Sequence, residues 1–163
     1  MSKLTPSTPN PEFLRRAIAL AIQNVDTGAG GPFAAVIVRD GKIVGEGVNT
    51  VTATLDPTAH GEVNAIRAAC TALGAFTLDG CELYTSCEPC PMCLAAIYWS
   101  RLDRSYYAAT CEDAAAAGFD DRALYRELTL PVAKRWIPMV QSLREEACLA
   151  FQAWLEKEDR LRY

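Results

Sequence analysis

Residues 81–100, CELYTSCEPCPMCLAAIYWS, are the stretch that decides the fold of this chain. Its first part, residues 81–86, has the composition of a short buried strand, and its last part, residues 91–100, is an apolar helix opened by proline. Within seven residues at the junction lie three cysteines: Cys87, Cys90 and Cys93. The stretch therefore predicts a strand that leads into a helix, with thiols gathered at the start of the helix.

Strands are predicted on both sides of this stretch. Residues 33–38 and 43–48 are apolar runs on either side of Asp40-Gly41, a pair that is typical of a hairpin turn. Residues 104–109 form a further strand-like run after the helix.

Helices are predicted between and beyond the strands. Asn10-Pro11 opens an amphipathic helix that reaches about Val25, and Asp56-Pro57 opens another that ends at Gly74. Two further helices are expected at 113–117 and 143–155, the second with a capping box from Ser142 to Glu145. Helices that alternate with strands predict an α/β domain, with a sheet covered by helices on both faces.

Composition narrows the class of protein. The chain has 163 residues, of which 50% are hydrophobic and 22% charged, so it is expected to be one globular domain, residues 1–163. No apolar run is long enough for a membrane helix, and the first ten residues lack the apolar core of an export signal. A net charge of −4 argues against a nucleic-acid partner. These features predict a cytoplasmic protein that acts on a small molecule, away from membranes.

A metal site is predicted from the histidine and cysteine spacing. The single histidine, His60, lies in Ala59-His60-Gly61-Glu62, and thirty residues later comes Pro89-Cys90-Pro91-Met92-Cys93. His-x-Glu followed by Pro-Cys-x-x-Cys is the signature of zinc deaminases of nucleobases. His60, Cys90 and Cys93 would be three zinc ligands, which leaves the fourth position for water. Glu62 would be the proton shuttle.

The spacing of His60 and Glu62 sets a condition on the helix that carries them. Residues two apart normally point to opposite sides of a helix, so the pair can converge only in the opening turn. The Asp56-Pro57 start is expected to place them there.

Two alternatives use the same residues. With Cys87 as a fourth ligand the site would be a closed zinc staple without chemistry. A thioredoxin-like redox pair would use Cys90 and Cys93, but would leave His60 and Glu62 without a role.

At this level of detail the chain resembles the cytidine deaminase superfamily, and within it the bacterial guanine deaminases. The resemblance runs from about Phe13 to Tyr163. Its pieces are GGPFAAVIV (30–38), DPTAHGEVNAIRAAC (56–70), YTSCEPCPMCLAAIYWSR (84–101), AGFDD (117–121) and the terminal helix. It implies a three-layer α/β/α sandwich around a mixed sheet of about five strands.

The resemblance also implies further site residues. Phe33 and Asn49 would hold the base beside His60, Trp99 would line the pocket, and Asp121 would handle protons or the exocyclic amine. Residues 136–163 would be exchanged between the two subunits of a homodimer, so that Tyr163 closes the partner's site.

The residues by themselves leave these added roles open. Asn49 could be a turn residue, Phe33 and Trp99 could belong to the core, and Asp121 could lie in a solvated turn or cap a helix. One departure from the family lies inside the metal motif, where Gly61 stands at a position that is usually Ala. The other is Ala95, which replaces a common Gly in the zinc helix.

The function implied is zinc-dependent hydrolysis of guanine to xanthine and ammonia, in purine catabolism or salvage. In this reading a zinc-activated water attacks C2 of the base. A guanosine deaminase shares the same motifs, and a tRNA adenosine deaminase shares the metal motif but would favour a basic surface. A zinc-stapled binding module is the alternative without catalysis.

Overall fold

The computed structural model of the chain describes residues 8–162. The chain forms two compact units that meet in sequence between Arg122 and Ala123, and each is described by itself.

The first unit is built on a sheet of four strands: β1 (Ala34–Arg39), β2 (Lys42–Val48), β3 (Cys81–Cys87) and β4 (Arg104–Ala109). The strand order is β2-β1-β3-β4. β1 runs antiparallel to both neighbours, whereas β3 and β4 are parallel, so the sheet is mixed as expected.

The sheet has four strands in the described residues where about five were expected. After Ala109 the chain turns directly into a helix, because Thr110 forms a capping box with Asp113. The segment that follows the second unit's first helix contains Pro131 and Pro138 and forms no strand. Among the described residues after Ala109, therefore, no strand pairs with β4.

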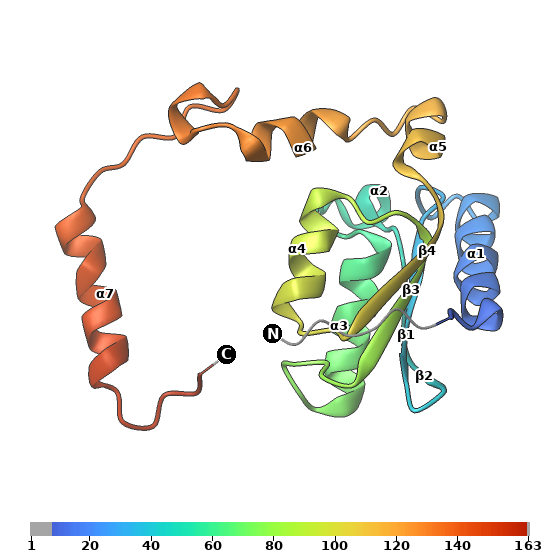
Figure 1. Ribbon diagram of the computed structural model, residues 1–163, viewed down its shortest axis with the longest axis horizontal. Coiled ribbons are helices and arrows are strands. Elements are labelled where there is room, and N and C mark those ends of the chain that lie inside the picture. Colours follow the sequence, from blue (N-terminus) through green and yellow to red (C-terminus); the bar gives the residue numbers. More distant parts are fainter. Residues whose placement is uncertain (1–7, 163) are drawn as a thin grey trace. The chain divides into compact units, whose positions relative to one another are not determined.

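Helices cover both faces of this sheet (Figure 1). α1 (Pro11–Asp26) packs on one face, against β1, β3 and β4, while α3 (Gly61–Leu73) packs on β1 and β2 on the other and contacts α4 (Pro91–Trp99). The three-layer α/β/α prediction is confirmed. Asn10 caps α1 by accepting a hydrogen bond from the Glu12 amide at 3.0 Å.

Alternating residues of β1 divide the core between the two faces. Ala35 and Ile37 belong to the cluster beneath α3, together with Leu83. Val36 and Val38 belong to the cluster beneath α1. Successive residues of a strand point to opposite faces of the sheet, so β1 contributes side chains to the core on both sides.

The predicted start of α3 is wrong. Asp56-Pro57 does not open this helix, which begins at Gly61 with His60 as its N-cap residue. The preceding residues instead form the one-turn helix α2 (Val51–Thr54), after which Asp56 accepts hydrogen bonds from the Thr58 amide and hydroxyl. This local bonding holds Asp56 in a turn outside the helix.

α6 (Arg122–Thr129) begins at the boundary and continues into the second unit, which also contains the short 3-10 helix η1 (Val132–Lys134) and α7 (Arg144–Glu156). The predicted capping box at Ser142 is wrong, because the N-cap residue of α7 is Leu143, with a left-handed φ of 53° and no side-chain cap. None of these three helical segments contains a buried residue among those described.

A membrane-spanning helix is absent from the part of the chain that the structure describes, since no helix there combines the necessary length and hydrophobicity.

Candidate metal centre

The predicted ligands converge where α3 and α4 begin. His60 is the N-cap residue of α3 and Cys90 that of α4, and Cys93 lies in the first turn of α4. β2 and β3 end at the same edge of the sheet, because Val48 pairs with Ala34 and Ala35 pairs with Thr85. The segment after β2, which includes α2, leads to α3, and a short connection after β3 leads to α4, so residues thirty apart in sequence come together.

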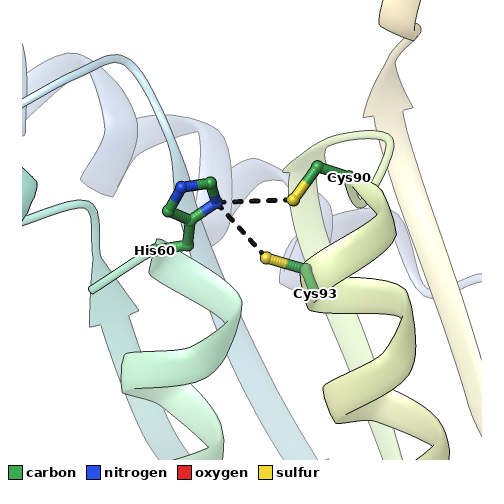
Figure 2. Close-up of side chains that lie close together, drawn as sticks. All are labelled: His60, Cys90 and Cys93. Atoms are coloured by element: carbon green, nitrogen blue, oxygen red, sulfur yellow. Dashed lines mark hydrogen bonds between the residues drawn. The ribbon is translucent and has the colours of Figure 1, made fainter. Parts of the chain in front are cut away.

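The three donor atoms have the spacing of a zinc site (Figure 2). His60 Nδ1 lies 3.6 Å from Cys90 Sγ and 3.4 Å from Cys93 Sγ, and all three atoms lie within 4.8 Å of one another. Two ligands of a tetrahedral zinc ion, one nitrogen and one sulfur, are separated by about 3.6 Å. The donor set and its spacing thus fit Zn²⁺, which is the metal of this site.

The electrostatics of the ligands favour a bound cation. The hydrogen bond from the Cys93 thiol, together with the facing His60 imidazole, lowers the pKa of Cys90 to about 4. The thiolate at Cys90 and burial both raise the pKa of Cys93, so without metal the two sulfurs hold one proton between them. A divalent cation displaces that proton and binds both sulfurs as thiolates.

Glu62 points into the same site. The extended backbone of His60 (ψ 157°) and the opening turn of α3 allow the two side chains to converge, as the spacing argument required. Cys93 Sγ lies 3.4 Å from Glu62 Oε2, and Glu62 is only 6% exposed. Burial raises the pKa of this carboxyl group. A buried carboxyl beside a metal site is suited to take up and release a proton.

Cys87 does not complete a closed site. Its thiol donates to the Thr110 carbonyl oxygen at 3.5 Å, and burial raises its pKa to about 11. Its sulfur is not among the three clustered donor atoms. Within the described residues the cluster supplies three protein ligands, which is the number that catalytic zinc sites use.

Phe33 and Asn49 lie side by side at the end of the β1–β2 hairpin. The Asn49 amide donates to the Phe33 carbonyl oxygen at 2.8 Å, and Asn49 Oδ1 accepts from the Val51 amide at 3.2 Å. The sequence argument missed Asn24, a buried residue of α1 whose Nδ2 donates to the carbonyl oxygens of Gly31 and Asn49. The sequence signal that could have identified Asn24 is its position on the apolar face of α1, seven residues after Ala17.

Asp121 differs in its surroundings from the neighbouring Asp120. Its Oδ1 is buried and has no hydrogen-bond partner among the described residues. Burial raises the pKa of the Asp121 carboxyl, and the nearby Cys90 raises it further. The neighbouring Asp120 instead forms hydrogen bonds with the Arg122 amide and guanidinium. The two adjacent aspartates therefore differ: Asp120 is held in a local cap, whereas Asp121 has a buried carboxylate oxygen without a hydrogen-bond partner among the described residues.

Phe119 was also missed by sequence reasoning. Its ring meets that of Phe33 edge to face, with centroids 4.9 Å apart. This contact joins the AGFDD segment to the start of β1, and its only sequence signal was the aromatic residue within AGFDD itself.

The structure does not bring Trp99 to the ligands. Trp99 is the last residue of α4, at the end opposite Cys90, and is 73% exposed. Tyr163 lies outside the described residues.

Comparison with known proteins begins with the family. Residues 7–109 match the family described as cytidine and deoxycytidylate deaminase zinc-binding region. The chain is 55% identical to a guanine deaminase of Bacillus subtilis over 151 residues, which are 93% of this chain and 97% of that protein. It is 40% identical to a tRNA-specific adenosine deaminase of Aquifex aeolicus, over 60% of this chain and 64% of that one.

Solved structures of guanine deaminases are also similar to this chain. The crystal structure of guanine deaminase from Bacillus subtilis superposes with a TM-score of 0.92 at 53% identity, covering 96% of this chain and 99% of that one. A guanine deaminase from Nitrosomonas europaea gives a TM-score of 0.65 at 34% identity, covering 71% and 68%. Similarity to the first protein extends through the second unit.

Proposed function

The chain belongs to the zinc-dependent cytidine and deoxycytidylate deaminase family, and from that premise we propose that it hydrolyses guanine to xanthine and ammonia. The observation that carries the substrate is the similarity to a guanine deaminase over nearly the full length of both proteins. The match to a tRNA-specific adenosine deaminase covers only 60% of this chain. The net charge of −4 also disfavours an RNA substrate.

The metal is held by His60, Cys90 and Cys93. Zinc, when bound, supplies a Lewis acid that makes a water molecule nucleophilic near neutral pH. Two thiolates balance its charge, which keeps the centre neutral within a largely buried site.

Glu62 moves the protons of the reaction. It accepts a proton from the attacking water and delivers it to N3 of the base as the new C–O bond forms at C2. It then takes the proton of the new C2 hydroxyl and passes it to the exocyclic amine, so that the bond from C2 to this amine breaks with release of ammonia and the C2 carbonyl of xanthine forms. Its raised pKa suits a group that must be protonated and deprotonated in each turnover.

The base is held by the residues around Glu62. Phe33 provides a ring on which the purine packs, and Asn49, whose Oδ1 accepts from Val51, presents its amide group as a donor to the purine. Asp121 grips the 2-amino group with its unpartnered Oδ1 as that nitrogen becomes tetrahedral. Tyr163 closes the pocket of the partner in the assembled protein, whereas Trp99, at the far end of α4, takes no part in it.

The assembled protein is proposed to be a homodimer in the cytoplasm, with residues 136–163 exchanged between subunits. The support for this proposal is α7, which has no buried residue and leaves three large apolar side chains, those of Leu149, Phe151 and Leu155, each at least 60% exposed. An apolar helix without a core of its own requires a surface to cover it. Exchange of a segment is a low-cost route to a two-fold dimer.

An ammonia-release panel tests the proposed substrate. Guanine, guanosine, adenine, cytosine and cytidine are each supplied to the zinc-loaded protein. Release from guanine should exceed release from the other four. A preference for guanosine would move the assignment to a nucleoside deaminase, and no release from any of them would favour a binding module.

A further inference from the structure

Glu88 lies in the short loop between β3 and α4, two residues before the ligand Cys90, and has no role in the proposed chemistry. It connects this loop to the start of the helix that follows β4, α5 (Cys111–Ala116). Glu88 Oε2 accepts a hydrogen bond from the Cys111 amide at 3.2 Å. The Glu88 amide donates to the Ala109 carbonyl oxygen at 2.9 Å. Glu88 therefore binds the backbone on both sides of Thr110.

The hydrogen bond from Cys111 to Glu88 completes the start of α5. The Cys111 amide is the first of this helix and has no acceptor within it, so its acceptor must come from outside. A carboxylate suits this place, because the helix dipole leaves partial positive charge there. The capping box of Thr110 and Asp113 serves other amides, those of Thr110 and Asp113 themselves. Glu88 thus supplies a bond that the local cap does not.

α5 leads directly to the residues proposed to hold the base. After α5 the chain turns at Gly118, which has a φ of 95°. The turn is followed by Phe119, whose ring contacts that of Phe33, and by Asp121, whose Oδ1 is buried. Only α5 and this turn separate Cys111 from Asp121. The position of the start of α5 therefore governs where Asp121 lies.

A neighbouring contact supports this connection without replacing it. The Cys87 thiol donates to the Thr110 carbonyl oxygen at 3.5 Å, and Cys87 pairs with Ala109 across the parallel strands β3 and β4. A thiol is a weak donor, and this bond reaches the residue before α5. Of these contacts, only the one from Cys111 to Glu88 holds the helix itself.

We propose that Glu88 is a positioning residue that fixes Asp121 relative to the zinc ligands, by binding the start of α5 to the loop that carries Cys90. This inference rests on the proposed function, because it takes Asp121 as the group that holds the 2-amino group of guanine. When the bond to Cys111 is lost, α5 and the turn after it shift, and Asp121 meets the amine less well. The zinc ligands keep their places on α3 and α4.

The test replaces Glu88 by methionine and by glutamine in the zinc-loaded protein. Both have nearly the length and shape of glutamate and both lack its charge, but only glutamine keeps an oxygen that accepts from the Cys111 amide. Glu88→Met should lower turnover of guanine by roughly 5- to 50-fold, because small misplacements in a site are costly. Glu88→Gln should stay within about two-fold of the parent, because it keeps the acceptor.

Both variants should retain one zinc per chain. Loss of zinc from Glu88→Met would place its effect on the ligands and overturn the proposal. The proposal also fails if Glu88→Met leaves turnover unchanged, or if Glu88→Gln loses as much turnover as Glu88→Met.

A double-mutant cycle shows whether Glu88 acts through Asp121. In the Asp121→Asn protein, Glu88→Met should change turnover by no more than about two-fold, because the group that Glu88 positions is already impaired. An effect of Glu88→Met that is equally large in the parent and in the Asp121→Asn protein would overturn the proposal.

Glu112→Ala is the control for a general disturbance of α5. Glu112 is exposed, and its carboxylate lies within 4.8 Å of the Glu88 carboxylate, so this change removes a charge from the same neighbourhood. The bond from Cys111 to Glu88 stays, and turnover should remain within about two-fold of the parent. A loss as large as that of Glu88→Met would count against the positioning role.

Hydrogen exchange gives a readout that does not depend on activity. The Cys111 amide should exchange faster in Glu88→Met than in the parent, and at the rate of the parent in Glu88→Gln. An unchanged rate in Glu88→Met would refute the proposal. If Glu88→Met does not fold, Glu88→Ala, which adds no volume, replaces it with the same expected results.

Asp121→Asn alone separates this inference from the proposed function. If Asp121→Asn lowers turnover of guanine and Glu88→Met does not, only the positioning role of Glu88 fails. If Asp121→Asn leaves turnover unchanged, the proposed role of Asp121 is wrong and the inference fails with it.

Discussion

At the scale of single residues, the metal ligands are the most direct test. Cys90→Ala removes one of two thiolates, so the purified protein should fall from one zinc per chain to well below that, and activity should be lost with the metal. Elemental mass spectrometry measures the zinc content, and ammonia release measures the activity.

Cys87→Ser is the matched control for this change. The serine hydroxyl can still donate to the Thr110 carbonyl oxygen, and position 87 lies outside the ligand cluster. Zinc content should stay at that of the parent. Loss of zinc from Cys87→Ser and retention in Cys90→Ala would reverse the ligand assignment.

Glu62→Gln separates the shuttle from the ligands. Glutamine keeps the shape of the side chain and can still accept from Cys93, so zinc content and Tm should persist. Because an amide cannot carry the proton, turnover should fall by about 10²–10⁴-fold. Turnover within a few fold of the parent would exclude Glu62 as the proton shuttle.

Asp121→Asn tests the residue that distinguishes guanine chemistry from that of the wider superfamily. Turnover of guanine should drop by roughly tenfold or more, because the amine loses a charged acceptor. Asp120→Asn is the neighbouring control, since Asp120 binds Arg122 in a local cap. Equal turnover in the two variants would show that Asp121 is an ordinary turn residue.

At the scale of elements, α1 is tied to β2 by one paired contact. Arg16 donates to both carboxylate oxygens of Glu46 at 2.7 Å. The hydrogen bonds from Arg16 hold the pKa of Glu46 below its usual value of about 4.5. A folded-state pKa below the unfolded value means stability that is present above about pH 4.5 and is lost as pH falls through the lower value.

Glu46→Gln should therefore reduce the free energy of unfolding by about 0.5–1 kcal/mol near neutral pH, as paired surface charges do. The difference from the parent should shrink as pH falls below about 4.5. Glu12→Gln is the control, because its ion pair with Arg15 lies within α1 and is well exposed. A difference that stays constant between pH 7 and pH 3.5 would contradict the role of this contact.

At the scale of the whole molecule, the C-terminal segment 136–163 carries the prediction that two subunits exchange a segment. Deletion of residues 161–163 should leave a dimer that binds zinc but turns over guanine slowly, since the apolar residues of α7, such as Phe151, remain to pack on the partner subunit. Size-exclusion chromatography with zinc analysis and ammonia release checks all three properties.

Mixing the truncated chain with a Glu62→Gln chain examines the exchange itself. In a mixed dimer the intact Glu62 site would receive the intact tail of its partner, so part of the activity should return after subunit exchange. Mixed dimers that form without any recovery would show that the tail does not complete the partner's site.

The sequence by itself determined the chemistry and the succession of elements. His-x-Glu and Pro-Cys-x-x-Cys identified the ligands because tetrahedral zinc limits which donors can combine, and the hairpin and the strand-to-helix junction followed from local turn and cap preferences. The resemblance to guanine deaminases that these motifs supported is confirmed by the comparisons. Where local signals competed, as at Asp56-Pro57 and Ser142, the predicted helix starts were wrong.

Only the tertiary structure decided how the pieces of the site are spaced. It placed Phe33 beside Asn49, gave Asp121 a buried oxygen without a partner, and brought Gly61 against the backbone of β1. These relations join residues far apart in the chain, and no local preference encodes them. They arise because one sheet fixes where α3 and α4 begin, and close packing at that edge then sets which residues meet.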